Sequence, residues 1–210
     1  MKDNKIMMEE PSKTIIPQPI NSVGPAQNKQ EKLAATMEIL EIPTPKVLEA
    51  IEELRLSAAA DPEDAFFLAI PNVNKTKEQL HKEAEEMFGE GKFVILCWNG
   101  DEPMGVCRAE KHEVRGEGVW YIGSDYMKKN FRGHGFGQKM LATRLDEIRK
   151  RGGIKAVGIV KKINTRRMHI ARKFNFKAVA QNKSGEGYVI ETDLTDSEVI
   201  SKINEALNAG

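Results

Sequence analysis

Three glycines, Gly133, Gly135 and Gly137, stand at alternating positions in the stretch N-F-R-G-H-G-F-G-Q-K-M-L. The stretch follows an apolar, strand-like run, G-V-W-Y-I-G-S-D-Y-M, and leads into a segment whose apolar residues have helical spacing. Glycine at this density indicates backbone that must come close to a neighbouring group, such as a ligand. A strand, a glycine-rich loop and a helix in this order therefore predict a fold in which loop N–H groups and a helix N-terminus bind phosphate.

Three phosphate-binding spacings can be tested against this loop. A nucleotide P-loop requires Gly-Lys followed by Ser or Thr, which does not occur in the chain. The dinucleotide fingerprint G-x-G-x-x-G requires a glycine where Gln138 or Met140 stands. The spacing R-x-x-G-x-G remains, and Arg132, Gly135 and Gly137 satisfy it.

Strand-like runs and helical patterns alternate along the rest of the chain. The dipeptide Asn99-Gly100 predicts a hairpin turn, Gly152-Gly153 predicts a helix end, and Thr195 to Glu198 reads as a capping box. The order predicts an α+β (α/β) fold with a mixed, mostly antiparallel sheet of about seven strands and helices on both faces. The expected strands cover residues 35–42, 92–98, 104–109, 118–127, 154–160, 176–180 and 188–194, and the expected helices 44–54, 76–90, 137–151, 165–174 and 196–207.

Composition divides the chain into three parts. Residues 1–32 are rich in Pro, Asn, Gln and Lys, which predicts a flexible tail before a globular domain at 33–195. Residues 196–210 form an amphipathic helix that either docks on this domain or meets a partner, and a homodimer is one such arrangement. The chain has no apolar stretch long enough for a signal peptide or a membrane span, so we expect a cytoplasmic protein without a membrane partner.

The net charge of +1 gives no electrostatic reason to expect nucleic-acid binding. The charge is nevertheless uneven, because residues 148–185 hold twelve Lys or Arg and no Asp or Glu. This basic segment is either a solvated face or a site for an anionic ligand, and nucleic acid is the weaker alternative. Cys97 and Cys107 each lie in an apolar run without metal-ligand spacing, so we interpret both as buried thiols and expect no metal.

The stretch from Met127 to Gly137 resembles the acetyl-CoA-binding motif of the GNAT family of N-acetyltransferases. The order of strands and helices resembles the family's fold, the acyl-CoA N-acyltransferase fold, over residues 34–195, and 164–176 resembles its last CoA-binding helix. The resemblance implies that the Met127 amide meets the pantetheine arm and that the loop amides hold the pyrophosphate. The implied CoA site consists of Met127, Arg132, Gly133, His134, Gly135, Phe136, Gly137, Gln138, Asn164, Arg167 and Lys173.

The resemblance implies an acetyl-CoA-dependent N-acetyltransferase that moves the acetyl group directly to a primary amine of a small molecule or protein. No covalent enzyme intermediate is expected, because neither cysteine has a positioned base. In many family members a tyrosine acid follows the asparagine by seven residues, but counting from Asn164 gives Ala171. His169 lies two residues before Ala171, and on a helix a two-residue offset faces a different side. The alternative is a CoA-binding module of weak or no activity that acts as an interaction protein.

Alternation along residues 118–127 places Tyr121, Gly123, Asp125 and Met127 on one face, unless a bulge intervenes. We therefore predict Asp125 as the general base, with Tyr121 as a second catalytic candidate. The structural alternatives are a strand-end residue paired with a lysine for Asp125 and a groove wall for Tyr121.

The acceptor groove implied by the resemblance lies between residues 56–74 and 181–187. Asp61, Glu63 and Asp64 in the first range could attract a cationic amine, or could be a solvated helix-end cluster.

Overall fold

A computed structural model describes residues 35–60, 64 and 75–209. Two units are distinguished along the chain, Met1–Lys32 and Leu33–Gly210, and every described residue belongs to the second. The predicted tail, together with Asp61 and Glu63 of the predicted acidic cluster, lies outside the described residues.

The described strands form a seven-stranded sheet in the order β1-β2-β3-β4-β5-β7-β6. Only β4 and β5 are parallel, and every other neighbouring pair is antiparallel. The prediction of a mixed, mostly antiparallel sheet is therefore confirmed. The strands are β1 (Ala35–Leu40), β2 (Lys92–Asn99), β3 (Glu102–Lys111), β4 (Val119–Met127), β5 (Lys155–Lys161), β6 (Lys177–Gln181) and β7 (Gly187–Asp193).

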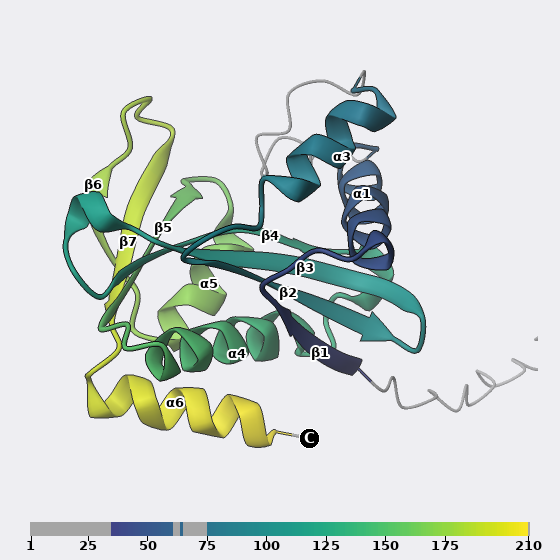
Figure 1. The fold of residues 1–210 in the computed structure, drawn as a ribbon. Helices are drawn as coiled ribbons and strands as arrows, with labels where there is room; N and C mark the ends of the chain where they lie inside the picture. The colour runs from purple at the N-terminus through teal and green to yellow at the C-terminus, as the bar shows by residue number, and fades with distance from the viewer. Residues whose placement is uncertain (1–34, 61–63, 65–74, 210) are drawn as a thin grey trace, which may run out of the picture. The chain divides into compact units, whose positions relative to one another are not determined.

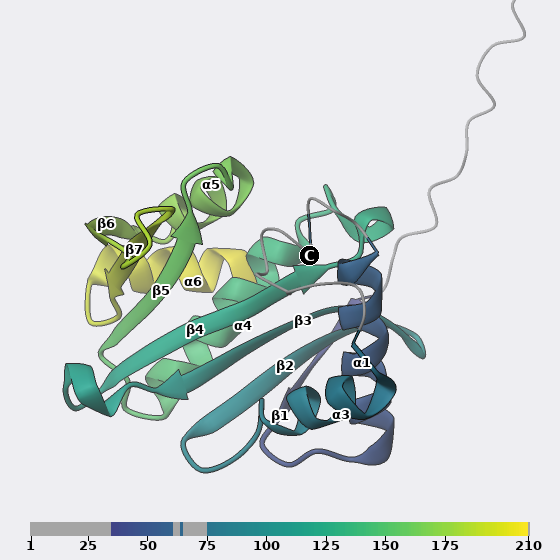
Figure 2. The same cartoon turned by 90° about the horizontal axis from the view of Figure 1, so that it is seen from above.

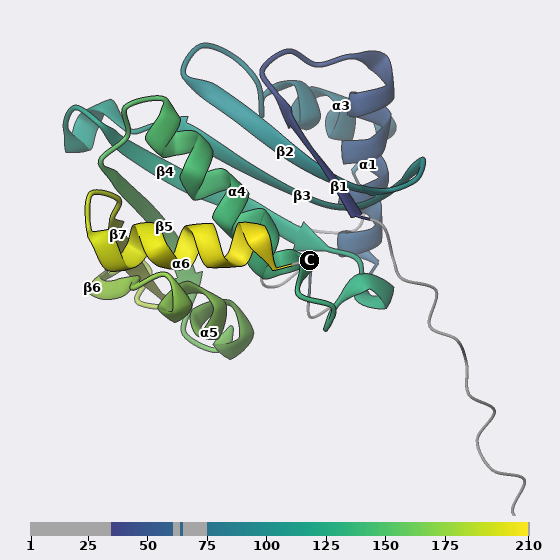
Figure 3. The same ribbon diagram turned by 90° about the horizontal axis from the view of Figure 1, so that it is seen from below.

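Helices cover both faces of the sheet, as the sequence predicts (Figure 1). Helices α1 and α3 pack on one face with buried residues of β2, β3 and β4, while α4, α5 and α6 share a second core on the other face (Figure 3). The described helices are α1 (Pro45–Ala59), α3 (Lys77–Glu85), α4 (Phe136–Lys150), α5 (Thr165–Lys173) and α6 (Ser197–Asn208).

Side-chain caps fix where most of these helices begin. The Thr44 hydroxyl accepts the Val47 N–H ahead of Pro45, and Thr76 and Gln79 form a reciprocal capping box. At α6 the cap is Asp196, whose side chain accepts the Glu198 N–H. The prediction that Thr195 opens this helix was wrong by one residue, because its hydroxyl donates to Asp193 instead.

The last helix docks on its own domain. Val199, Ile203 and Ala206 of α6 are buried in the same core as α4, and α6 runs beside α4 in Figures 1 and 3. This contact resolves the choice that the sequence left open for residues 196–207. Among the described residues, no helix has both the length and the apolar character that a membrane crossing requires.

Strand β4 contains a β-bulge. Val106 of β3 pairs with Tyr126, but Arg108 pairs with Gly123, so β4 has an extra residue between these pairs. Ser124 absorbs it with a left-handed φ of 55°. Because the bulge shifts the alternation by one residue, side chains after Ser124 point to the opposite face from the one that uninterrupted alternation predicts.

Strands β4 and β5 diverge at their carboxyl ends (Figure 2). Their pairing ends at Ile122 and Gly158, whereas β4 continues with β3 to Met127 and β5 with β7 to Lys161. We call residues 123–127 of β4 and 159–161 of β5 the β4–β5 fork. In this sheet β4 and β5 do not pair along the fork, so their facing backbone edges can bind an extended ligand.

Candidate active site

The glycine loop joins the fork to the N-terminus of α4. Gly133 and Gly135 have φ values of 88° and 84°, in the region that favours glycine. A Cβ added at either residue would meet no described heavy atom within 4 Å, so the backbone conformation, not crowding, requires glycine.

The start of α4 has no side-chain cap. Its N-cap is Gly135, and the first N–H groups of this stretch that donate to the described backbone are those of Gln138 and Lys139, both to the Gly135 carbonyl oxygen. The N–H groups from Gly133 to Gly137 thus remain available to an anion at the positive end of a fifteen-residue helix. The loop residues Gly133, His134 and Gly135 are exposed.

Arg132 holds the start of this loop in place. Its Nε donates to the Met127 carbonyl oxygen at 2.7 Å, and its guanidinium lies over the Tyr126 ring. Its Nη2 donates to Asp64, which is buried. In this structure the Arg132 side chain joins the loop to β4 and to Asp64, and its contact with the pyrophosphate stays a prediction. Asp64 is therefore not part of a solvated cluster.

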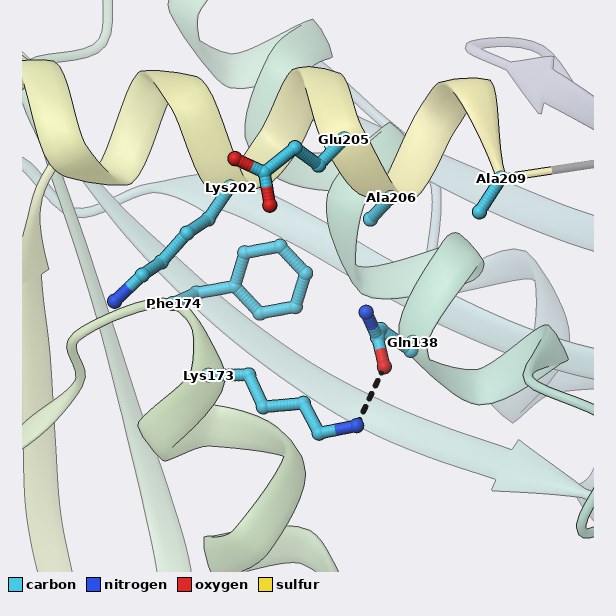
Figure 4. A pocket seen from close by; sticks show the side chains of 7 residues that line it. All are labelled: Gln138, Lys173, Phe174, Lys202, Glu205, Ala206 and Ala209. Carbon is cyan, nitrogen blue, oxygen red and sulfur yellow. Dashed lines mark hydrogen bonds between the residues drawn. The ribbon is translucent and has the colours of Figure 1, made fainter.

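The remaining predicted CoA residues lie on α5 and at the loop end. Asn164 caps α5 by accepting the Arg167 N–H at 2.9 Å. Lys173 donates to Gln138 Oε1 at 2.8 Å and so links α5 to α4. The side chains of Gln138 and Lys173 line a pocket of about 520 Å³ between α4, α5 and α6 (Figure 4). The other lining residues are Phe174, Lys202, Glu205, Ala206 and Ala209.

Arg167 lies away from the loop. Its Nη2 is 2.9 Å from Asp125 Oδ2, so the side chain reaches from α5 to β4. The other carboxylate oxygen of Asp125 is 2.7 Å from Nη2 of Arg144, an ion-pair contact without hydrogen-bond geometry. Three charged side chains from three elements therefore meet at the fork, and we call them the Arg–Asp–Arg cluster (Asp125, Arg144 and Arg167).

Tyr121 and Asp125 do not share the one face of the sheet that uninterrupted alternation predicts, because the bulge lies between them. Trp120 and Ile122 belong to the core under α4, so Tyr121 points to the opposite face, beside Arg108 and Glu110. Asp125 follows the bulge and contacts Arg144 of α4. The two catalytic candidates thus lie on different faces of the sheet. Because both oxygens of Asp125 already contact guanidinium groups, the geometry no longer supports it as a general base.

Arg144 is the residue of this site that the sequence analysis missed. Its side chain is 0% exposed, and its Nη1 donates to the carbonyl oxygens of Arg108 at 3.1 Å and Gly123 at 3.3 Å. These carbonyls flank the bulge, so the guanidinium takes the place of ladder partners. The sequence did contain a signal, because Arg144 falls between Met140, Leu141, Leu145 and Ile148 on the apolar face of the helix.

Tyr121 keeps its proton at neutral pH. Burial raises the pKa of its phenol, Arg108 opposes this, and Asp125 and Glu110 add to the rise. Gly123 leaves room for the ring, since a Cβ there would lie 3.0 Å from Tyr121 Cε1. The phenol is therefore a hydrogen-bond donor on the face of α1 and α3.

Two residues of α5, Ala171 and His169, do not replace the tyrosine acid of other family members. Ala171 is fully buried in the core with Met168 and Phe174. His169 is exposed on the outer side of the helix, in agreement with the helical offset.

Both cysteines are buried and remain protonated. Burial raises the pKa of Cys97 to about 11 and that of Cys107 to about 12. At pH 8 we expect native protein to react with iodoacetamide at least about 100-fold more slowly than the unfolded chain, because the thiolate is the nucleophile. Mass spectrometry of timed samples measures this rate, and rapid alkylation of native protein would contradict the assignment.

The same shifts have a consequence for stability. A thiol whose pKa is raised by folding stabilises the protein, and this contribution is fully present below the pKa of the unfolded thiol. It is lost progressively as the pH rises from the pKa of the unfolded thiol through that of the folded thiol. We therefore expect the free energy of unfolding to fall above about pH 9, where thiols of the unfolded chain ionise.

Many cations of the basic segment are paired with acidic residues of other segments. Lys155 contacts Glu191, Lys150 contacts Asp146, and Arg151 contacts both Glu147 and Glu41. The segment is therefore partly neutralised, which weakens the nucleic-acid alternative further.

The sequence model of the "Acetyltransferase (GNAT) family" matches residues 50–176, more than half of the chain. The chain belongs to this family of acetyltransferases, whose members use acetyl-CoA, and the predicted resemblance is confirmed. A comparison with curated protein sequences gives no match.

Solved structures confirm the fold. The PaiA N-acetyltransferase of Thermoplasma acidophilum, in complex with coenzyme A, is 13% identical, with a TM-score of 0.54 over 75% of this chain and 99% of its own. The ribosomal-protein-S18-alanine N-acetyltransferase of Escherichia coli is 13% identical, with a TM-score of 0.56 over 76% and 94%. An aminoglycoside 6′-acetyltransferase of type Ii is 17% identical, with a TM-score of 0.56 over 75% and 97%.

Proposed function

We propose that this protein transfers the acetyl group of acetyl-CoA directly to a primary amine of a small molecule or a protein. The observation that carries the proposal is the loop of left-handed glycines at the uncapped N-terminus of α4, next to the β4–β5 fork. Backbone donors at a helix N-terminus suit the pyrophosphate of CoA, and unpaired strand edges suit the two amides of its pantetheine arm.

The donor would lie across the elements that the sequence analysis selected. The N–H groups from Gly133 to Gly137 would bind the pyrophosphate, and the backbone of Met127, at the end of β4, would meet the pantetheine arm. The pocket between α4, α5 and α6 is next to Gln138 and Lys173, so we place the nucleotide end of CoA there. This placement uses Lys173 as a cation near the phosphates.

The acceptor would approach from the face of α1 and α3. Tyr121 projects to that face as a protonated phenol, and Glu110 pairs with it across the strands. The neutral amine attacks the thioester carbon, so that a C–N bond forms while the C–S bond breaks. A phenol O–H donor near the carbonyl would stabilise the developing oxyanion, and we assign this role to Tyr121.

A thiol-release assay tests the proposal. We expect free CoA thiol to appear when the protein and acetyl-CoA are mixed with at least one member of a panel of polyamines, aminoglycosides, amino acids and peptide N-termini. A mixture without amine is the control for hydrolysis, and mass spectrometry of the acetylated amine confirms transfer.

One observation favours a second candidate, a CoA-binding module without activity. Ala171 is buried and apolar, and Asp125 is already paired with arginines, so neither supplies the expected acid or base. Both candidates predict that acetyl-CoA raises the melting temperature. A raised melting temperature without thiol release from any amine of the panel would favour the module.

A further inference from the structure

The Arg–Asp–Arg cluster carries one more positive than negative charge. Two guanidinium groups share one carboxylate, and the other group facing Arg167, the buried thiol of Cys107, is neutral. A buried net charge is costly unless something offsets it. The imbalance therefore favours a ligand, or a reaction step, that brings negative charge to the fork.

The three members differ in how far a ligand can reach them. Arg144 is 0% exposed and is committed to the carbonyl oxygens of the bulge. Arg167 is 15% exposed and Asp125 is 24% exposed. Burial lowers the pKa of Arg167, but a guanidinium stays charged at neutral pH. Arg167 is thus the accessible cation of the cluster.

The sulfur of CoA would come to the same place, if the proposed function is correct. A pyrophosphate at the glycine loop directs the pantetheine arm along the fork toward the point where β4 and β5 begin to pair, at Ile122 and Gly158. Arg144 donates to Gly123, the first residue of the fork, so the cluster marks this end.

We propose that Arg167 is a catalytic residue that stabilises the leaving thiolate of CoA. As the C–S bond breaks, its electron pair passes to sulfur, and the guanidinium offsets the negative charge there. The proton lost by the attacking amine goes to solvent, so that amine and thioester give amide, thiolate and one proton. No acid is then required at position 171. Asp125 contacts both guanidinium groups and offsets part of the positive charge of the cluster.

Titration of the thiol of bound CoA tests the assignment without any acceptor. In a saturated complex with wild-type protein we expect the thiol pKa to lie at least about one pH unit below that of free CoA titrated in the same buffer, measured by ultraviolet absorbance of the thiolate. Arg167→Gln should return it to the value of free CoA, while Arg167→Lys, which keeps the charge, should leave it lowered. Cys97 and Cys107 titrate well above this range.

Two further variants distinguish the effect of the Arg167 charge on the thiol pKa from a general disturbance of the structure. Arg166→Gln removes an exposed cation next to Arg167 and should leave the thiol pKa as in wild type. Asp125→Asn removes the negative charge of the cluster, so the thiol pKa should stay lowered or fall further. Affinity for CoA, measured by calorimetry, should change less than about fivefold in Arg167→Gln, because the pyrophosphate contacts remain.

Several results would overturn the assignment. An unshifted thiol in the wild-type complex, or equal shifts in Arg167→Gln and Arg166→Gln, would remove Arg167 from the reaction while leaving CoA binding intact. If wild-type protein did not bind CoA at all, the proposed function itself would be wrong, and so would the role assigned to Arg167.

Discussion

Gly135→Asp is expected to weaken CoA binding by about 100-fold, which corresponds to about 2.7 kcal/mol. Gly135 is the N-cap of α4 with a φ of 84°, and no described atom lies within 4 Å of an added Cβ. A carboxylate at this place would therefore extend into the space where the loop amides are directed. There it repels the pyrophosphate and competes for the same N–H groups. Calorimetric titration of each variant with CoA measures the effect.

Gly100→Asp is the matched control for this substitution. Gly100 lies in the β2–β3 turn with a φ of 59° and equally open surroundings, so the cost of a left-handed non-glycine residue is similar, at about 1–2 kcal/mol. We expect both variants to lose comparable stability but only Gly135→Asp to lose affinity. Unchanged affinity of Gly135→Asp would show that the loop does not bind the phosphates.

Arg144→Met is expected to lower the free energy of unfolding by about 3–5 kcal/mol. The methionine keeps an apolar stem in the core, but it removes the donor of the Arg108 and Gly123 carbonyl oxygens. It also leaves Asp125 with Arg167 as its remaining guanidinium contact. Buried acceptors without partners add to the cost. Urea unfolding monitored by circular dichroism measures the change.

Arg149→Met on the same helix provides the comparison. Arg149 is partly exposed and lies 3.6 Å from Asp146, so its loss should cost less than about 1 kcal/mol. If the two variants were equally stable, neither the bulge of β4 nor the β4–β5 fork would depend on the buried guanidinium.

The sequence was sufficient for features that depend on local patterns. The glycine spacing placed the loop before α4, Asn99-Gly100 placed the β2–β3 turn, and Gly152-Gly153 placed the end of α4. At Gly153 the requirement is steric, because a Cβ would lie 2.3 Å from Ile148 Cγ2. Such signals are readable since each depends on a few neighbouring residues.

The placement of Tyr121 and Asp125 could not be predicted in the same way. Nothing in the letters G-S-D marks a bulge, because a serine in the left-handed region is held there by its surroundings and not by its own preference. The bulge moved Asp125 away from Tyr121 and toward α4. The pairing of Asp125 with Arg144 and Arg167 joins three elements distant in sequence, so local patterns contain no trace of it.

Backbone amide chemical shifts, recorded with CoA and separately with pantetheine, test whether the glycine loop binds the pyrophosphate of CoA. CoA and pantetheine share the thiol arm, but only CoA carries the pyrophosphate. We expect CoA to shift the amides of Gly133 to Gln138 strongly, pantetheine at saturation to leave them nearly unchanged, and both ligands to shift residues of the β4–β5 fork. Loop amides that do not respond to CoA, or that respond equally to both ligands, would contradict pyrophosphate binding by the loop.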